Sequence, residues 1–140
     1  MESASANALS QKALILRWVN AFNARNLDDL LACLDPEVDF RPLKLTGLDP
    51  SYRGHDGVRR WFGRLGELRY GHCIELTEVR DSSQGRLLAI GALRVGKYGL
   101  VTPFCALHTM NGGLIAVARH YPHEADSVER VNLISRVARP

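Results

Sequence analysis

The stretch that decides the fold is residues 104–121, FCALHTMNGGLIAVARHY. On both sides of Asn111-Gly112-Gly113 the side chains can be divided between two faces by simple alternation, as in a β-strand. A short glycine-containing loop between two such runs predicts a β-hairpin. We therefore expect strands over residues 101–110 and 114–122, joined by a three-residue loop.

A three-residue loop determines which residues lie opposite each other in this hairpin. Ala106 would pair with Ala118, and Phe104 with His120. One face of the hairpin is then expected to carry Phe104, Ala106, His108, Met110, Ala116, Ala118 and His120. In this register His108 and His120 lie about 13 Å apart, at roughly 3.3 Å per residue, so no shared metal site is predicted.

Three further strands are expected, over residues 38–41, 73–81 and 86–95. The second of them does not alternate cleanly, because Ile74 and Val79 fall on opposite faces. A β-bulge near Thr77 or Glu78 would restore the alternation and bend the sheet.

Helices are predicted where apolar residues recur at intervals of three and four. The expected helices cover residues 9–23, 27–35, 55–65 and 124–136. Asn26 is expected to cap the second helix, with Asp28 and Asp29 in its first turn, where the helix dipole favours carboxylates. This helix should carry Leu34 on its apolar face and end before Pro36.

Length and composition indicate one globular domain. The chain has 140 residues, of which 46% are hydrophobic and 24% charged. We expect residues 1–8 to be disordered and residues 9–137 to form a single domain. The apolar run over residues 13–19 is far shorter than the roughly 20 residues of a membrane span, and Glu2 is unlike the start of a secretory signal. No membrane contact and a cytoplasmic location are therefore expected.

Charge and cysteine content argue against two further classes of function. The net charge of +3 is concentrated in residues 53–69, which contain five arginines but only two carboxylate residues. We interpret this segment as a solvated helix face, and no nucleic-acid partner is predicted. Cys33, Cys73 and Cys105 are widely spaced and are interpreted as buried apolar residues rather than zinc ligands or disulfides. No metal and no cofactor are predicted.

The order of these elements predicts an α+β fold. Three helices and a short strand precede four long antiparallel strands. We expect a cone-shaped, curved antiparallel sheet, with the three helices of the N-terminal half packed in its concave face, as in a cystatin-like roll. Such a cone leaves a pocket at its mouth.

Three stretches carry a resemblance to a known family: residues 27–42, LDDLLACLDPEVDFRP; residues 52–62, YRGHDGVRRWF; and residues 104–121. They resemble the nuclear-transport-factor-two-like superfamily and, within it, the SnoaL-like polyketide cyclases and ketosteroid isomerases. The resemblance implies the same α+β cone. It does not imply one function, because the superfamily includes isomerases, cyclases, dehydratases, epoxide hydrolases and proteins without catalytic activity.

The resemblance also allows the ketosteroid isomerase residues to be checked one by one. It places Trp18 at the helix tyrosine, Arg41 or Pro42 at the base, Ala106 at the late-strand acid and Phe62 at the supporting tyrosine. None of these side chains can perform the corresponding step, so steroid isomerisation is not expected. The last two strands carry no carboxylate for an epoxide-hydrolase arrangement either.

Two hypotheses of function remain. The missing oxyanion groups favour a non-catalytic binding or dimerisation module, with an apolar pocket for a small hydrophobic ligand. The alternative is an enzyme of the isomerase, cyclase or hydrolase type, with His108 as general acid/base on a small hydrophobic substrate. The residues expected to bind the ligand are Trp18, Phe22, Phe40, Tyr52, Phe62, Phe104, His108 and His120.

Both faces of the strand over residues 86–95 are apolar. Leu87 and Leu93 lie on one face, and Leu88 and Ile90 on the other. One layer of helices covers only one face of a sheet, so a homodimer through the outer face is expected.

Overall fold

The computed structural model describes residues 4–43, 48–67, 71–82, 85–96 and 100–122. The elements in these residues are α1 (Ala4–Asn23), α2 (Leu27–Ala32), β1 (Leu34–Arg41), β2 (Tyr52–Arg53), α3 (Gly54–Glu67), β3 (His72–Asp81), β4 (Arg86–Val95), β5 (Leu100–Asn111) and β6 (Leu114–Pro122). The helix expected over residues 124–136 lies outside the described residues.

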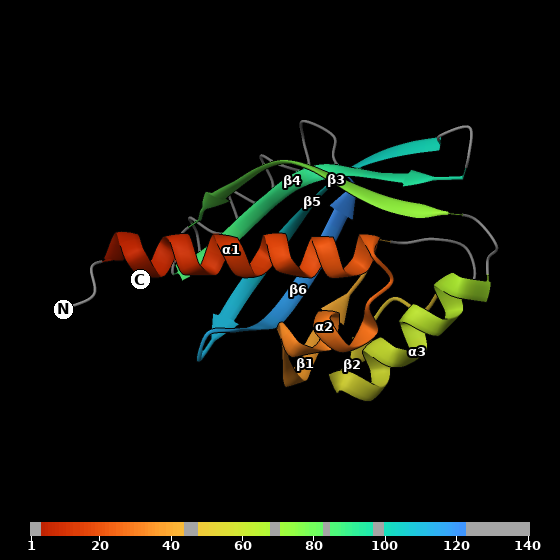
Figure 1. Ribbon diagram of the computed structural model, residues 1–140, viewed down its shortest axis with the longest axis horizontal. Coiled ribbons are helices and arrows are strands. Elements are labelled where there is room, and N and C mark those ends of the chain that lie inside the picture. Colours follow the sequence, from red (N-terminus) through yellow and green to blue (C-terminus); the bar gives the residue numbers. More distant parts are fainter. Residues whose placement is uncertain (1–3, 44–47, 68–70, 83–84, 97–99, 123–140) are drawn as a thin grey trace.

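The six strands form one curved sheet in the order β2-β1-β6-β5-β4-β3, with α1 running across its concave side (Figure 1). Neighbouring strands are antiparallel except β1 and β6, which run parallel. The α2 and α3 helices lie together beside β1 and β2. The predicted α+β cone is confirmed, with a mixed sheet in place of a wholly antiparallel one.

The second helix is shorter than the sequence predicts. Asn26 caps it as expected, because its side-chain oxygen accepts a hydrogen bond of 3.1 Å from the backbone N–H of Asp29. The helix ends at Ala32, and Leu34 begins β1 instead of continuing the helix. The Cys33 carbonyl accepts a hydrogen bond from the N–H of Ile115 in β6, so sheet pairing replaces the helix here.

Other element boundaries differ by a few residues. The first helix begins at Ala4, five residues before the predicted start, and α3 extends to Glu67. The strand β2 was not predicted, because two residues are too few to show alternation. The extent of the single domain over residues 9–137 stays a prediction.

The predicted bulge in β3 is confirmed. Leu76 pairs with Gly91 and Glu78 with Ile90, which leaves Thr77 as the extra residue. A Cβ atom on Gly91 would lie 2.4 Å from the carbonyl oxygen of Glu75, so only glycine permits this close approach. The bulge lets β3 curve over the concave side of the sheet.

The final hairpin turns at Gly112 and Gly113, whose φ angles are 58° and 82°. Two positive φ angles in a two-residue loop are typical of a type I′ turn. The loop is thus one residue shorter than predicted, and Asn111 pairs with Leu114.

A second irregularity in this hairpin lies between Thr109 and Met110, where the register shifts. Together with the shorter turn it moves the pairing by two positions, so His120 lies opposite Ala106 instead of Phe104. The predicted register was therefore wrong. The shorter turn and the irregularity each move the pairing by one residue. A shift of two residues returns each side chain to the same face of the strand, so the predicted face is largely retained.

The concave face of the hairpin is buried against the helices. Its core residues are Phe104, Ala106, Ile115 and Ala118, and His108 is buried beside them. Ile115 occupies the place predicted for Ala116, because the irregularity lies between Ile115 and Val117 and makes Ala116 the extra residue of β6.

A smaller apolar cluster lies apart from this core. It contains Leu88, Cys105 and Leu107, which are 1%, 0% and 8% exposed. These side chains are already buried within the single chain. The homodimer expected through the outer sheet face stays a prediction.

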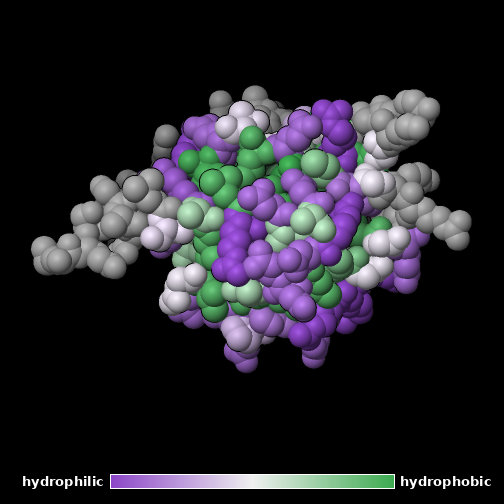
Figure 2. All heavy atoms as spheres, viewed as in Figure 1, coloured by the Kyte–Doolittle hydropathy of each residue, from purple (hydrophilic) through white to green (hydrophobic). Residues whose placement is uncertain are grey.

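The described arginines of the arginine-rich segment, Arg53, Arg59, Arg60 and Arg64, are exposed, as interpreted from the sequence. Arg59 contacts Asp56 at 2.6 Å, and Arg64 contacts Glu67 at 4.0 Å. Hydrophilic side chains dominate the lower part of the face shown in Figure 2, where α2 and α3 lie. Within the described part of the chain, no helix is long and apolar enough to cross a membrane.

Candidate functional site

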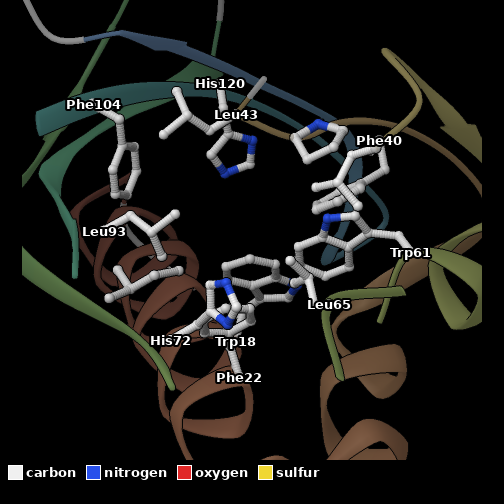
Figure 3. Close-up of a pocket in the computed structure, with 13 residues that line it drawn as sticks. Trp18, Phe22, Phe40, Leu43, Trp61, Leu65, His72, Leu93, Phe104 and His120 are labelled. Carbon is white, nitrogen blue, oxygen red and sulfur yellow. The ribbon is translucent and has the colours of Figure 1, made fainter. Parts of the chain in front are cut away.

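The concave side of the sheet holds a pocket of about 400 Å³, including its open mouth (Figure 3). It is lined by Trp18, Phe22, Phe40, Pro42, Leu43, Leu48, Trp61, Leu65, His72, Ile74, Leu93, Phe104 and His120. None of these described lining residues is an Asp, Glu, Lys or Arg. Among the described lining residues, the two histidines are the only titratable groups, and the others are apolar.

Aromatic rings from three elements form one side of this pocket. Trp18 and Phe22 lie four residues apart on α1, and their rings stack with centroids 5.9 Å apart. Trp61 of α3 stacks on Trp18 at 6.4 Å and contacts Phe40 of β1 at 4.5 Å. These surfaces suit a flat apolar ligand.

His120 of β6 reaches into the pocket (Figure 3). Its Nδ1 lies 3.0 Å from the carbonyl oxygen of Arg41. A carbonyl can only accept a hydrogen bond, so Nδ1 carries the proton, and in the neutral ring Nε2 keeps its lone pair. Burial lowers the pKa of His120 to about 4, against a smaller opposing effect of this hydrogen bond. The ring is therefore neutral at pH 7.

His108 lines a smaller adjoining cavity, which shares Trp18, Ile74, Phe104 and His120 with the pocket. Its side chain is 3% exposed, and its Nδ1 has no hydrogen-bond partner among the described residues. Burial, and secondarily the charge of His120, lower the pKa of His108 to about 3.

The two histidines are closer than predicted. Their ring centroids are 6.2 Å apart, whereas the sequence-based register separated the residues by about 13 Å. The shift of two positions in the hairpin accounts for the difference.

The family model for the SnoaL-like domain matches residues 15–118, most of the chain. The chain belongs to the SnoaL-like family. The resemblance noted in the sequence is thereby confirmed. No curated protein sequence matches this SnoaL-like protein.

Solved structures share the fold of this SnoaL-like protein. Bal32a, from a soil-derived mobile gene cassette, has a TM-score of 0.74 and 18% identity over 89% of this chain and 98% of its own. A polyketide cyclase candidate from Xanthomonas campestris pv. campestris has a TM-score of 0.70 and 18% identity over 88% and 97%. An LEH-like epoxide hydrolase from M. tuberculosis has a TM-score of 0.65 and 16% identity over 93% and 94%. At these identities the likeness shows the fold alone.

The structure brings Trp18, Phe22, Phe40, Phe104 and His120 together in the main pocket of the SnoaL-like domain. His108 lines the adjoining cavity instead.

Two other predicted ligand-binding residues line neither cavity. The hydroxyl of Tyr52 accepts a hydrogen bond from the N–H of Asp49, and the Arg60 guanidinium lies 5.2 Å from its ring centre. Phe62 is half-buried and packs against the core from α3.

Sequence reasoning missed several wall residues, namely Leu43, Leu48, Leu65, His72, Ile74 and Leu93. Leu93 could have been found, because it shares a strand face with Leu87. From the sequence we interpreted His72 as a loop or helix-start residue, whereas in the structure it begins β3 and is buried. The sequence around Leu43 and Leu48 has no regular period, so no pattern indicated that these two side chains line the pocket.

Of the positions matched to ketosteroid isomerase residues, Trp18, Pro42 and Ala106 lie around the two cavities, whereas Phe62 and Arg41 do not. Trp18 and Pro42 line the pocket, and Ala106 lines the adjoining cavity. The Arg41 side chain is exposed and lies 3.4 Å from Asp39. Among the described residues, no group of three His, Cys, Asp or Glu side chains could hold a metal ion.

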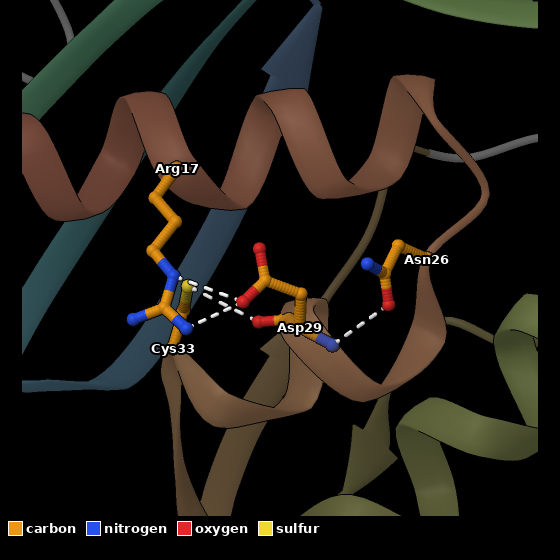
Figure 4. A network of polar contacts seen from close by, with 4 residues as sticks. All are labelled: Arg17, Asn26, Asp29 and Cys33. Atoms are coloured by element: carbon orange, nitrogen blue, oxygen red, sulfur yellow. Dashed lines mark hydrogen bonds and ion pairs between the residues drawn. The ribbon is translucent and has the colours of Figure 1, made fainter.

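Contacts outside the pocket hold α1 in place. Arg17 of α1 donates to the Asp29 carboxylate of α2 through Nε, at 3.0 Å, and through Nη2 (Figure 4). The thiol of Cys33 donates to the Asp29 carbonyl at 3.4 Å. Because Trp18 follows Arg17, this network helps to position the aromatic wall.

The C-terminal end of α1 is joined to β3. The side-chain amide of Asn23 donates to the Ile74 carbonyl at 2.9 Å and accepts from the Ile74 N–H at 2.8 Å. Arg25 donates to the His72 carbonyl at 2.7 Å. Both β3 residues line the pocket, so these bonds connect the helix directly to the opposite wall.

Proposed function

We propose that this SnoaL-like protein binds a small, uncharged, hydrophobic molecule in the pocket between α1, α3 and the concave side of the sheet. The observation that carries the proposal is the composition of the wall, in which aromatic and aliphatic side chains surround two histidines. A charged ligand would lose its hydration here without gaining a charged partner. A neutral, flat ligand would bury apolar surface and stack on the rings.

The names of two structural neighbours, a polyketide cyclase candidate and an epoxide hydrolase, are compatible with a small organic ligand. The proposal rests on the wall of this pocket and does not depend on those names.

Calorimetric titration with two probes of one skeleton tests the proposal. The neutral probe is 1-tetralone, and the charged probe is 1,2,3,4-tetrahydro-1-naphthoate. We expect binding of the first only. Equal binding of both, or of neither, would contradict the proposal.

A pair of variants in α3 locates the binding. Leu65→Trp fills the pocket from α3 and should weaken the binding of 1-tetralone, because Leu65 is part of the wall. Arg64→Trp adds the same side chain at an exposed position of the same helix and should leave affinity unchanged. Melting temperatures establish that both variants are folded.

The second candidate function is that of an enzyme with a histidine general base. It is favoured by the unpartnered Nδ1 of His108 beside His120. A neutral imidazole in an apolar cavity can accept a proton from a substrate hydroxyl or an activated carbon. Turnover that disappears in His108→Gln, with ligand affinity and melting temperature retained, would support this role. Unchanged turnover would contradict it.

A further inference from the structure

The apolar cluster on the outer face of the sheet is buried more deeply than its described neighbours explain. Leu88 of β4 and Cys105 and Leu107 of β5 are 1%, 0% and 8% exposed. The apolar residues that pack against them, Ile90 and Tyr121, are again strand residues, and no described helix contributes to the cluster. Among the described helices, α1 crosses the opposite, concave side (Figure 1). Because a single sheet leaves its second face in water unless another layer packs on it, the cluster requires such a layer.

The chain leaves the sheet beside this cluster. Tyr121 of β6 lies opposite Cys105 of β5, and β6 ends one residue later at Pro122. The strands next to β6 on this side are β5 and then β4, which carry the cluster. Residues 123–140, which lie outside the described part of the chain, therefore begin at the border of the cluster.

The sequence after β6 has the pattern that a covering helix requires. Val128, Val131 and Ile134 recur at intervals of three, which places them within about 120° of one another around a helix. Glu129 falls on the opposite side of such a helix. We propose that residues 124–136 fold back as an amphipathic helix onto the outer face of the sheet and bury the cluster under these three apolar side chains.

The dimensions of a helix and of a sheet match in this arrangement. Three residues of an α-helix rise about 4.5 Å, and neighbouring strands lie about 4.8 Å apart. A helix that starts at β6 and crosses the strands therefore places Val128 over β5 and Val131 over β4, the two strands that carry the cluster. The helix is about 20 Å long, which exceeds the roughly 14 Å between β6 and β3.

Burial within one chain favours this segment over a second copy of the protein. A cluster reserved for a dimer interface is exposed in the isolated chain, whereas Leu88 and Cys105 are at most 1% exposed in it. The homodimer was expected because one layer of helices covers one face of a sheet, and the helix over residues 124–136 supplies the second layer. The segment thus competes with a second copy for the outer face, and the full chain should be monomeric at micromolar concentration.

The position of the segment is tested by a disulfide within the full chain. The variant Val128→Cys should form one with Cys105 on treatment with diamide, because the new thiol lies over β5. Glu129→Cys is the matched control, since residue 129 points away from the sheet and its thiol should not pair with Cys105. Both variants carry Cys73→Ser, which removes the more exposed native thiol. Peptide mapping of the non-reduced monomer identifies the cross-linked pair.

Labelling of Cys105 tests whether the segment covers the cluster. Val131→Lys places a charge on the buried side of the helix, so the segment should detach and Cys105 should react with a thiol reagent about tenfold faster or more. Glu129→Lys adds the same side chain on the opposite side and should leave Cys105 protected. Cys33 is buried elsewhere in the core and should stay unlabelled in both variants unless the whole domain unfolds.

Each outcome bears directly on the proposal. Cross-linking in Val128→Cys alone, with faster labelling of Cys105 in folded Val131→Lys, would support it. Equal cross-linking in Val128→Cys and Glu129→Cys, or unchanged labelling in Val131→Lys, would overturn it. If Cys33 is labelled as well in Val131→Lys, the domain has unfolded and the cross-link decides.

Light scattering of the full chain separates the two candidate occupants of the outer face. A monomer in which Cys105 is protected supports the C-terminal segment. A dimer in which Cys105 becomes reactive on dilution would assign the face to a second copy and overturn the proposal.

Discussion

The imidazole of His120 lies edge to face with that of His108, with ring centroids 6.2 Å apart and planes at 82°. His108 is buried and His120 half-buried among apolar side chains, and burial lowers the pKa of His108 to about 3 and that of His120 to about 4. Protonation of either ring places a cation in a cavity without a described carboxylate in its wall. The stability of the protein is therefore linked to the protonation of this pair.

We expect acid to destabilise the fold through these histidines. An unfolded histidine titrates near pH 6.5, so below this pH the unfolded chain binds protons that the folded chain rejects. The free energy of unfolding should fall from pH 7 downwards and level off only below the folded pKa of about 3. For His108 alone the loss between pH 7 and pH 5 is about 2 kcal/mol, measurable by urea unfolding.

The variant His108→Leu isolates this contribution. It removes a buried nitrogen that has no described partner, so stability at pH 7 should be unchanged or slightly higher. Its loss of stability between pH 7 and pH 5 should be smaller than that of the wild type by about 2 kcal/mol. Parallel pH profiles for the two proteins would contradict a neutral, buried His108.

Gly91 should be intolerant of a side chain. The variant Gly91→Ala would place its Cβ 2.4 Å from the Glu75 carbonyl, so the backbone beside the β3 bulge must move. We expect a loss of about 1–3 kcal/mol in urea unfolding. Gly63→Ala is the matched control, because its Cβ meets nothing within 4 Å on α3. The control should gain up to about 1 kcal/mol in helix propensity.

Asn23 should contribute more to stability than other asparagines of α1. The variant Asn23→Ala removes two hydrogen bonds to the Ile74 backbone and should cost about 1–3 kcal/mol in urea unfolding. Because Ile74 lines the pocket, affinity for 1-tetralone should fall as well. Asn20→Ala, at an exposed position of the same helix, should change neither quantity. Similar losses in the two variants would contradict the role of this bond pair.

The cysteines should differ in reactivity. Cys33 and Cys105 are buried, and burial raises the pKa of both thiols. Cys73 is half-buried, contrary to the expectation that all three are buried. A thiol reagent at pH 7.5 should therefore modify Cys73 in the folded protein and all three cysteines in urea. Rapid labelling of folded Cys73→Ser would contradict this order.

Sequence patterns predicted those features of the structure that depend on residues close together in the chain. Trp18 and Phe22, two of the residues expected to bind the ligand, line the pocket, and the mismatch between Ile74 and Val79 predicted a bulge near Thr77 or Glu78, which the structure has at Thr77. The overall cone followed from the order of elements together with the family resemblance.

The register between β5 and β6 could not be predicted from these patterns. The irregularity between Thr109 and Met110 leaves no trace in the alternation, because the two-residue turn compensates for it. The closeness of His108 and His120 depends on both features at once. Trp61 was expected on the apolar face of the third helix, but the presence of His72 from β3 in the same wall depends on packing between elements distant in sequence.

The attachment of α1 to β3 has a consequence for association between chains. As the last strand of the sheet in the described part of the chain, β3 has one edge with no described strand beside it, and such an edge can recruit a strand from another molecule. On this edge the N–H and C=O of Ile74 are both hydrogen-bonded to the side chain of Asn23, and the C=O of His72 accepts a hydrogen bond from Arg25. The end of α1 thus occupies the positions where an incoming strand would begin its ladder, and it protects the first part of this edge against intermolecular sheet growth.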